Sequence, residues 1–599
     1  MSQIKTAQYF KNNVATYNLL NKKYNQRSDL ISGMRIAVVI ISMIFLFLNY
    51  FYGNFNLIGM ILLSGIILFI GLIIAYNKTI KLQKKIGLLV KINKQYLDRL
   101  NGNWAFFANT GSQYSNLDHS YSNDLKIVGQ YSLFQLINTT TTFLGEQFLI
   151  QRLHDPIYDV ELIKLRQEAI QELGLKINWC QSFEMLGYMS DTETINLDSL
   201  VEWGRMPVKF NNFFFIILIQ VLPFILLLNL GLVYFSNYFI YSLFALFFIQ
   251  GLLTLYSYIY LTSLLKSIYS FKEQLNAIIN LLRWIESEPF ASSILANQKD
   301  LLFSNYTLAS QQIRLLNWMA DCIDIKFSPL LHFLLNLIFL WDFQFIILLD
   351  KWKLKSGHQI KLWLETIAVF EELSSFATLT HYELNGCYPN FTNNDVQFDA
   401  VKIGHPLINS KDRVCNDVKL NKACKIAIIT GSNMSGKSTF LRTLGINLVL
   451  ALSGAPVCAK KLICSPLSLY TSISIVDNLS HNVSTFYGEI QRINQMVKAV
   501  KIKRPFLFLI DEIFSGTNSH DRFIGAEKVM NIFFNAKSLG LVSTHDQKIT
   551  ELNIINSFGI SNFHFREYYN DDQLFFDYLL YPGISKTTNG LKFLKMIGI

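Results

Sequence analysis

Four uncharged apolar runs interrupt an otherwise mixed sequence, and they occur as two closely spaced pairs. The runs are Ile36–Tyr52, Leu57–Tyr76, Phe213–Phe235 and Tyr238–Leu261. About 20 helical residues cross the roughly 30 Å hydrocarbon core of a bilayer. Because the runs of each pair are separated by only a few residues, they must lie antiparallel. The pattern therefore predicts two transmembrane hairpins, over residues 36–76 and 212–265.

The alternative interpretation is a signal peptide followed by buried core helices. It is disfavoured because the first run lies behind 35 residues that include six basic side chains. A fifth apolar run, Phe327–Leu349, contains His332, Asp342 and Gln344. Counting it as a span would place the two ends of the chain on opposite sides of the membrane. We therefore expect a buried cytoplasmic helix in this region.

The remainder of the pattern is largely helical until about Lys425, where short apolar strands begin to alternate with helices. The expected strands are Ile426–Thr430, Phe506–Ile510, Leu541–Ser543 and Phe575–Leu580. Such alternation is typical of an α/β domain with a largely parallel sheet. This gives the expected order: a basic N-terminal segment (1–35), the first hairpin (36–76), a helical core (77–211), the second hairpin (212–265), more helical core (266–395) and the α/β domain (396–599).

Composition supports a chain that is partly embedded in lipid. Hydrophobic residues make up 51% of its 599 residues and charged residues only 16%. Residues 1–35 contain six Lys and Arg against one Asp, and residues 77–100 contain seven against one, so these flanks carry a net charge of +11, against +10 for the whole chain. Basic flanks of spans indicate the cytoplasmic side or contact with lipid headgroups before they indicate a DNA footprint. The seven cysteines have no metal-ligand spacing and read as reduced thiols.

A phosphate-binding loop follows the first expected strand. Gly431-Ser-Asn-Met-Ser-Gly-Lys-Ser-Thr439 fits the GxxxxGK[ST] pattern between a strand and a helix. Backbone N–H groups and the helix N-terminus of such a loop surround nucleotide phosphates. The residues expected to contact the phosphates are Gly431, Asn433, Gly436, Lys437, Ser438 and Thr439. Lys437 is expected to reach the β- and γ-phosphates, and the Ser438 hydroxyl to bind Mg²⁺.

Two later strands end in residues suited to hydrolysis. Asp511 and Glu512 follow the apolar run Phe506–Ile510. We expect Asp511 to hold Mg²⁺ and Glu512 to orient or deprotonate the attacking water. His545 ends the next strand and is a candidate sensor of the γ-phosphate.

These residues resemble the MutS family, and the resemblance extends beyond the general P-loop features. It rests on Asp511–Asp521, on Val483–Glu489 and on Gly404–Leu407 followed by Asn416, and it covers most of 124–180 and 370–599. It implies ATP as the nucleotide, with Arg413, Val414 and Asn416 near the adenine. It also implies a homodimer in which Ser484 of one subunit faces the γ-phosphate bound by the other. The fold class expected is an α/β P-loop ATPase domain after an all-α MutS-like core that transmembrane hairpins interrupt.

The sequence also departs from the family pattern. Ser432 and Ser435 replace the usual Pro and second Gly of the P-loop, and Phe514-Ser515 replaces the usual Gly-Arg. We expect no mismatch-reading domain before residue 124, because the basic segment and the first hairpin take its place. Leu452-Ser453-Gly454 imitates the signature of transporter ATPases but lies too close to Lys437, so that class is rejected.

Three functional classes follow from these observations. The first is a membrane-tethered ATPase that acts on DNA, linked by resemblance to mismatch repair. The second is a dimeric switch that assembles or remodels a membrane complex through a protein partner, without DNA. The third is a scaffold with a slow site, which the intact Lys437, Asp511 and Glu512 disfavour. All three place the ATPase domain on the cytoplasmic face of a membrane with about four spans.

Overall fold

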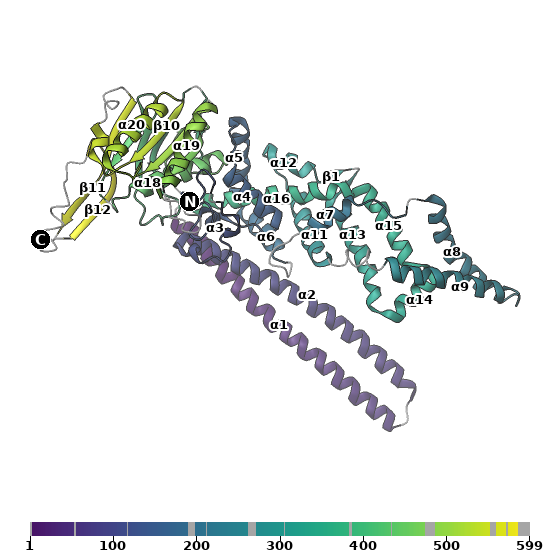
Figure 1. Ribbon diagram of the computed structural model, residues 1–599. Helices are drawn as coiled ribbons and strands as arrows, with labels where there is room; N and C mark the ends of the chain where they lie inside the picture. The colour runs from purple at the N-terminus through teal and green to yellow at the C-terminus, as the bar shows by residue number, and fades with distance from the viewer. Residues whose placement is uncertain are drawn as a thin grey trace.

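A helical body carries an α/β domain at one end, and two helical hairpins project from it, the first beside that domain and the second from the opposite end (Figure 1). This computed structural model describes residues 3–52, 55–116, 118–189, 198–210, 212–261, 271–304, 306–382, 386–393, 395–432, 434–473, 485–502, 504–551, 559–570 and 573–584. The order of elements along the chain follows the predicted order of helices, hairpins and strands.

The first hairpin consists of α1 (Gln3–Phe51) and α2 (Phe55–Asn101). The basic residues predicted as a separate segment form the first half of α1 itself. Near the base of the hairpin, the Phe10 ring stacks on Tyr96 with centroids 4.9 Å apart, and Phe10 is fully buried. The lower half of the same hairpin packs against no other part of the described chain, so its apolar side chains face outward.

The second hairpin consists of α8 (Phe213–Leu232) and α9 (Phe239–Tyr256), extended by a π-helical turn, η3 (Ser257–Leu261). The helices of both hairpins are long and apolar enough to cross a membrane. At most 22% of the most apolar 18-residue window of each is buried. The hairpins therefore present apolar surface that the protein itself does not cover.

The helical body is assembled from segments on both sides of the second hairpin. Before it come α3 (Leu133–Ile137), α4 (Phe143–His154), α5 (Val160–Leu175), α6 (Ile177–Gly187) and α7 (Asp198–Arg205). After it come α11 (Lys272–Ser287), α12 (Ser293–Asp300), the short strands β1 (Phe303–Ser304) and β2 (Thr307–Leu308), α13 (Ala309–Ile323), α14 (Pro329–Phe339), α15 (Trp341–Ser356), α16 (Ile360–Ala377) and α17 (Leu379–Tyr382).

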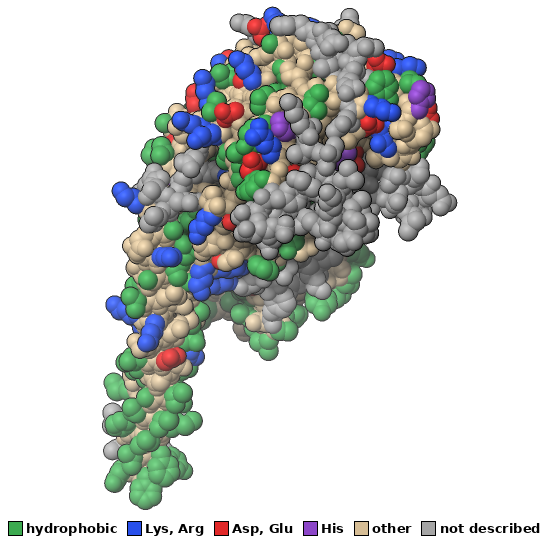
Figure 2. Space-filling model, turned by 90° about the vertical axis from the view of Figure 1, so that its left-hand side faces the viewer, with side chains coloured by type: hydrophobic (Ala, Val, Ile, Leu, Met, Phe, Trp, Pro, Cys, Tyr) green, Lys and Arg blue, Asp and Glu red, His purple; other side chains and the backbone are tan. Residues whose placement is uncertain are grey.

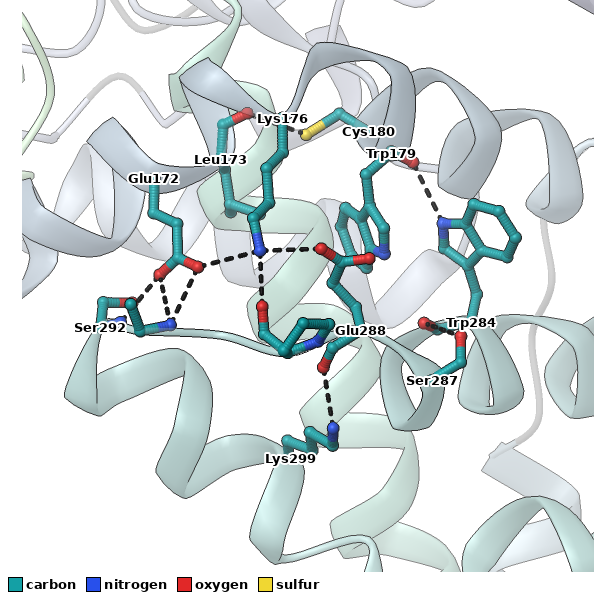
Figure 3. Close-up of polar contacts among 12 residues, drawn as sticks. Glu172, Leu173, Lys176, Trp179, Cys180, Trp284, Ser287, Glu288, Ser292 and Lys299 are labelled. Carbon is teal, nitrogen blue, oxygen red and sulfur yellow. Dashed lines mark hydrogen bonds and ion pairs between the residues drawn. The ribbon is translucent and has the colours of Figure 1, made fainter.

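Polar contacts join these two sets of helices (Figure 3). The Lys176 ammonium, at the end of α5, lies 3.1 Å from the Glu172 carboxylate and 2.8 Å from that of Glu288, just beyond α11. The Trp284 indole of α11 donates to the Trp179 carbonyl of α6 at 3.2 Å. The hairpin is thus an insertion into one continuous body.

The predicted single buried helix over Phe327–Leu349 is wrong. The chain bends by 76° between α14 and α15, at Leu340, whose φ of 49° lies in the left-handed region. The apolar side chains of α15 are mostly buried, but much of the α14 surface is exposed. The polar residues that suggested a buried helix turn inward and leave the apolar ones outside.

The α/β domain is built on a six-stranded sheet of order β12-β11-β6-β10-β9-β8. Its strands are β6 (Cys424–Thr430), β8 (Ser468–Ser472), β9 (Phe506–Asp511), β10 (Ser538–Ser543), β11 (Gly559–Asn570) and β12 (Gln573–Pro582). All neighbours pair in parallel except β11 and β12, which are antiparallel. The four predicted strands and the largely parallel sheet are confirmed. β8 and β11 were not predicted.

A smaller four-stranded sheet, also not predicted, has the order β3-β7-β4-β5. Its strands are β3 (Asn390–Phe391), β4 (Phe398–Ile403), β5 (Asn416–Leu420) and β7 (Lys461–Cys464). Among the described residues of the domain, the α-helices are α18 (Lys437–Leu452), α19 (Thr485–Ile502) and α20 (Ser519–Phe534). The side chains of the central strands are buried, as is typical of parallel strands covered on both faces.

Candidate nucleotide site

The phosphate-binding loop lies where β6 ends and α18 begins, at the carboxyl edge of the parallel sheet. Gly431 has φ 148° and Gly436 has φ 102°, values that side chains disfavour, and α18 starts at the next residue, Lys437. Neighbouring strands β9 and β10 bring Asp511 and His545 to the same edge because all three strands run parallel. This is where ligands bind in open α/β sheets.

The Lys437 ammonium is held by the loop's own backbone. Its Nζ donates to the carbonyls of Gly431 at 3.0 Å and Ser432 at 2.9 Å. Burial lowers the pKa of this ammonium, and the carboxylates of Asp511 and Glu512 partly offset the effect. The side chain is therefore poised for a stronger anionic partner than the carbonyls it now has.

His545 connects Lys437 to Glu512. Its Nε2 lies 3.1 Å from Lys437 Nζ and 3.1 Å from Glu512 Oε1. Burial, followed by repulsion from the Lys437 charge, lowers the pKa of this imidazole. In a neutral ring, Nε2 either accepts from Lys437 or donates to Glu512, but not both. The histidine therefore has two exclusive arrangements.

The acidic pair at the end of β9 is held by β10. Ser543 Oγ donates to Asp511 Oδ1, and the Glu512 N–H donates to the Ser543 carbonyl at 3.1 Å. Glu512 has φ 49°, a left-handed conformation that costs a non-glycine residue about 1–2 kcal/mol. Backbone strain of this kind concentrates at functional sites.

A cavity of about 580 Å³ opens beside the loop, a size typical of small-molecule sites. Seven predicted site residues line it: Val414, Asn416, Gly436, Lys437, Ser438, Thr439 and Glu512. Ile403, Ile408 and Phe565 give it an apolar wall. The cavity thus has a polar end at the phosphate-binding loop and an apolar region suited to a base.

Two predicted adenine contacts are engaged elsewhere. The Arg413 guanidinium donates to the Ile408 carbonyl at 3.0 Å and to Cys458 Sγ at 2.6 Å, and it is not among the cavity-lining side chains. The Asn416 amide donates to the Tyr578 carbonyl at 3.0 Å and accepts from the Leu580 N–H at 2.8 Å. Asn416 therefore borders the cavity while fastening β5 to β12.

Two other predicted residues, Asn433 and Ser484, lie outside the described residues. Tyr578 also lines the cavity and was not singled out from the sequence, and His405 was quoted only within the Gly404–Leu407 resemblance. The Tyr578 ring lies so close to Gly436 that a Cβ there would sit 3.1 Å from it. The sequence indicated only that Tyr578 belongs to the predicted strand Phe575–Leu580, not that its side chain lines the cavity.

Residues 427–599 match the family model described as MutS domain V. The C-terminal region is a MutS-type ATPase domain. The chain is 33% identical over 150 residues to "Endonuclease MutS2" of Thermus thermophilus, covering 25% of this chain and 20% of that protein. It is 28% identical over 240 residues to "DNA mismatch repair protein MutS" of Lactobacillus helveticus, covering 39% and 27%. It is 30% identical over 204 residues to the protein of the same name from Aquifex pyrophilus, covering 33% and 23%.

The chain thus spans only about a fifth to a quarter of the length of these relatives. The match includes the phosphate-binding loop, Asp511, Glu512 and His545, and an ATPase domain of this kind implies ATP binding. The hairpins and most of the helical body lie outside the matched residues. What the MutS-type ATPase domain drives must be inferred from this chain's own structure.

Proposed function

We propose that this protein is a membrane-anchored ATPase whose MutS-type domain uses ATP to switch the conformation of the helical body. The observation that carries the proposal is the contact series Lys437–His545–Glu512 beside the phosphate-binding loop. In this series, His545 Nε2 lies 3.1 Å from the proposed phosphate-binding cation, Lys437 Nζ, and 3.1 Å from the proposed general base, Glu512 Oε1. Lys437 begins α18, Glu512 directly follows β9 and His545 follows β10, so each can respond to the nucleotide.

ATP would exchange the partners of Lys437. A γ-phosphate is a stronger acceptor for an ammonium than the Gly431 and Ser432 carbonyls. Once Lys437 turns to the phosphate, His545 Nε2 is free to donate to Glu512. Glu512 is then held in place to orient or deprotonate the attacking water. His545 in this proposal reports the presence of phosphate to the general base.

The same site suits Mg²⁺. A serine hydroxyl and a carboxylate are hard oxygen ligands of the kind that Mg²⁺ takes beside phosphates, and Ser438 and Asp511 supply them. The Ser543 hydroxyl bond orients Asp511 Oδ1. The ion, when bound, would neutralise phosphate charge.

The two hairpins support membrane anchoring. Their apolar stretches are uncharged and mostly exposed, and both hairpins extend away from the α/β domain (Figure 1). Figure 2 shows hydrophobic side chains covering the end of the first hairpin, with Lys and Arg side chains above them. This arrangement matches a span bordered by a basic cytoplasmic interface. In this proposal the ATPase domain lies on the cytoplasmic side.

A role on DNA is the second candidate function, favoured by the names of the relatives. Against it, the basic excess is confined to residues 1–35 and 77–100, next to the hairpin. We therefore favour a switch that acts on a protein complex in the membrane. In either case two ATPase domains would pair, with Ser484 of one subunit facing the phosphate held by the other.

The deciding experiment is ATP hydrolysis by the detergent-purified full chain, with and without duplex DNA, at low and moderate salt. Lys437→Ala should abolish turnover, while Lys461→Ala, an exposed lysine on β7, should leave it unchanged. Turnover that DNA leaves unaffected would support the membrane switch. Stimulation by DNA that salt removes would establish the DNA-dependent function. Turnover that survives Lys437→Ala would overturn the proposed site.

A further inference from the structure

The helix α14 has its polar residues inside and its apolar residues outside. Its only polar side chains, His332 and Asn336, are 6% and 2% exposed. Its outer face consists of Leu330, Leu331, Phe333, Leu334 and Phe339, which are between 40% and 77% exposed. A helix on a water-exposed surface has the opposite arrangement. We therefore expect the outer face of α14 to contact an apolar environment and not water.

The inward polar groups are fully engaged with one carboxylate. His332 Nε2 lies 2.9 Å from Asp342 Oδ1, and the Asn336 amide donates to Asp342 Oδ2 at 3.0 Å. The Ser257 hydroxyl, in the last turn of the second hairpin, also donates to Asp342. These bonds fix α14 to both the hairpin and the start of α15, with its polar side chains turned away from the outer face.

The position of α14 continues the apolar surface of the second hairpin. The helix packs against both α9 and α8. On the hairpin, Phe224 and Phe248 are 74% and 69% exposed. The outer face of α14 therefore extends the surface of the hairpin, and no charged residue occurs between Pro329 and Phe339.

The length of α14 allows it to enter a bilayer but not to cross it. Eleven residues at 1.5 Å each give about 16 Å, roughly half of the hydrocarbon core. The 76° bend at Leu340 then directs the chain into α15, whose Phe343 and Ile346 are buried in the helical body. The chain thus enters and leaves on one side.

We propose that α14 is a re-entrant membrane helix whose outer face contacts lipid acyl chains beside the second hairpin. The inference rests on the proposed anchoring by α8 and α9. Lipid fits this face better than a protein partner does, because the face offers no hydrogen-bonding side chain or charge for recognition. Non-spanning backbone is tolerated in a membrane where other protein covers part of it, as α8 and α9 do here.

Photocrosslinking from the full chain tests this inference. Phe333→p-benzoylphenylalanine is compared with the same replacement at Phe224 on the hairpin and at Tyr306, which is 96% exposed on the β1–β2 turn. Each protein is reconstituted into vesicles of phosphatidylcholine and phosphatidylglycerol, irradiated and analysed by mass for phospholipid adducts. Retained ATP hydrolysis shows that each variant is folded.

We expect adducts at positions 333 and 224 and none at 306. Adducts at 224 without adducts at 333 would overturn the re-entrant helix and leave the hairpin spans intact. A crosslink from 333 to a second copy of the chain would show that α14 is a subunit interface, which also overturns the inference. Absence of adducts at both 333 and 224 would instead refute the membrane anchoring on which the inference rests.

Discussion

The Arg166 guanidinium pairs with the Glu372 carboxylate, with Nη2 and Oε1 2.6 Å apart, in the interior of the molecule. The Arg166 Nε also donates to the Ser453 carbonyl at 2.9 Å. Ser453 caps the end of α18, whose first residue is Lys437 of the phosphate-binding loop. One buried ion pair therefore joins α5 and α16 of the helical body to the far end of the nucleotide-binding helix.

Removing one partner of this pair should loosen that junction. The side chains of Arg166 and Glu372 are 6% and 3% exposed, so Arg166→Met leaves a buried carboxylate that keeps only the longer contact to Arg152 Nε, at 3.4 Å, among the ion pairs of the described residues. We expect a loss of at most about 3–5 kcal/mol of local stability, because Arg152 still offsets part of the Glu372 charge, measured as faster hydrogen exchange in the last turn of α18. Lys164→Met is the matched control, because its pair with Glu161 is solvent-exposed and worth at most about 1 kcal/mol. Equal exchange in the two variants would contradict the structural role of the pair.

Glu512→Gln should separate nucleotide binding from hydrolysis. The amide keeps the size of the side chain but cannot take a proton, so we expect turnover to fall by about 10²- to 10⁴-fold. Binding of a fluorescent ATP analogue should remain, because Lys437 and the loop are unchanged. Glu161→Gln, on an exposed side chain of α5, serves as the control. Unchanged turnover in Glu512→Gln would remove Glu512 from the proposed mechanism.

We expect the free energy of unfolding to decrease at acidic pH because of His405. Burial, together with the charges of Arg413 and Arg442, lowers its pKa from the ordinary 6.5 to about 3. The unfolded chain therefore binds a proton that the folded chain does not, and stability from this group is complete above pH 6.5 and is lost as pH falls towards 3. At about 1.4 kcal/mol per pKa unit the full loss is on the order of 5 kcal/mol.

Thermal unfolding followed between pH 7 and pH 4 checks this expectation. His405→Gln should flatten the acid side of the profile, since glutamine does not titrate. His520→Gln replaces an exposed histidine and should leave the profile unchanged. Parallel acid profiles for wild type and His405→Gln would show that His405 is not the group responsible.

In the first hairpin, the effect of a new lysine can be compared between the apolar stretch and the basic stretch of the same pair of helices. Ile67, in the middle of an apolar run, and Leu19, in the basic half, are 62% and 72% exposed. A lysine at the centre of a span costs about 2.5–3.5 kcal/mol of insertion free energy, so Ile67→Lys should expose the hairpin to proteinase K added to sealed vesicles. Leu19→Lys should not. Equal protection of the two variants would argue against a span at Ile67.

The parts of the fold that were predicted correctly are those that a short stretch of sequence identifies by itself. β6 and β9 are continuous apolar runs that end in a glycine loop and an acidic pair, and both strands were found within two residues. The small second sheet was missed because β4, β5 and β7 carry charged residues among their apolar ones, and β3 has only two residues. β11 was missed because its polar and aromatic residues do not form a clean run.

The α14 region shows why a run of apolar residues is ambiguous. His332 and Asp342 suggested a helix buried in a soluble body, yet they face each other inside and leave the apolar side chains exposed. The sequence gives the composition of a helix, but it does not show which face of the helix is buried in protein and which face is exposed. Similarly, the family resemblance aligns Arg413 with a residue that contacts the adenine base. The orientation of its side chain is instead set by its hydrogen bonds to Ile408 and Cys458.

The two hairpins join the helical body at separate places, the first beside the α/β domain and the second at the distant end (Figure 1). A protein with one anchor can swivel and tilt freely above a membrane, whereas two spaced anchors hold its long axis at a set inclination. If both hairpins anchor the protein as proposed, any bending of the body between them changes the lateral distance between the two hairpins. A nucleotide-driven movement in this molecule would therefore be converted into sliding within the plane of the bilayer, where a neighbouring membrane protein could be pushed or drawn in.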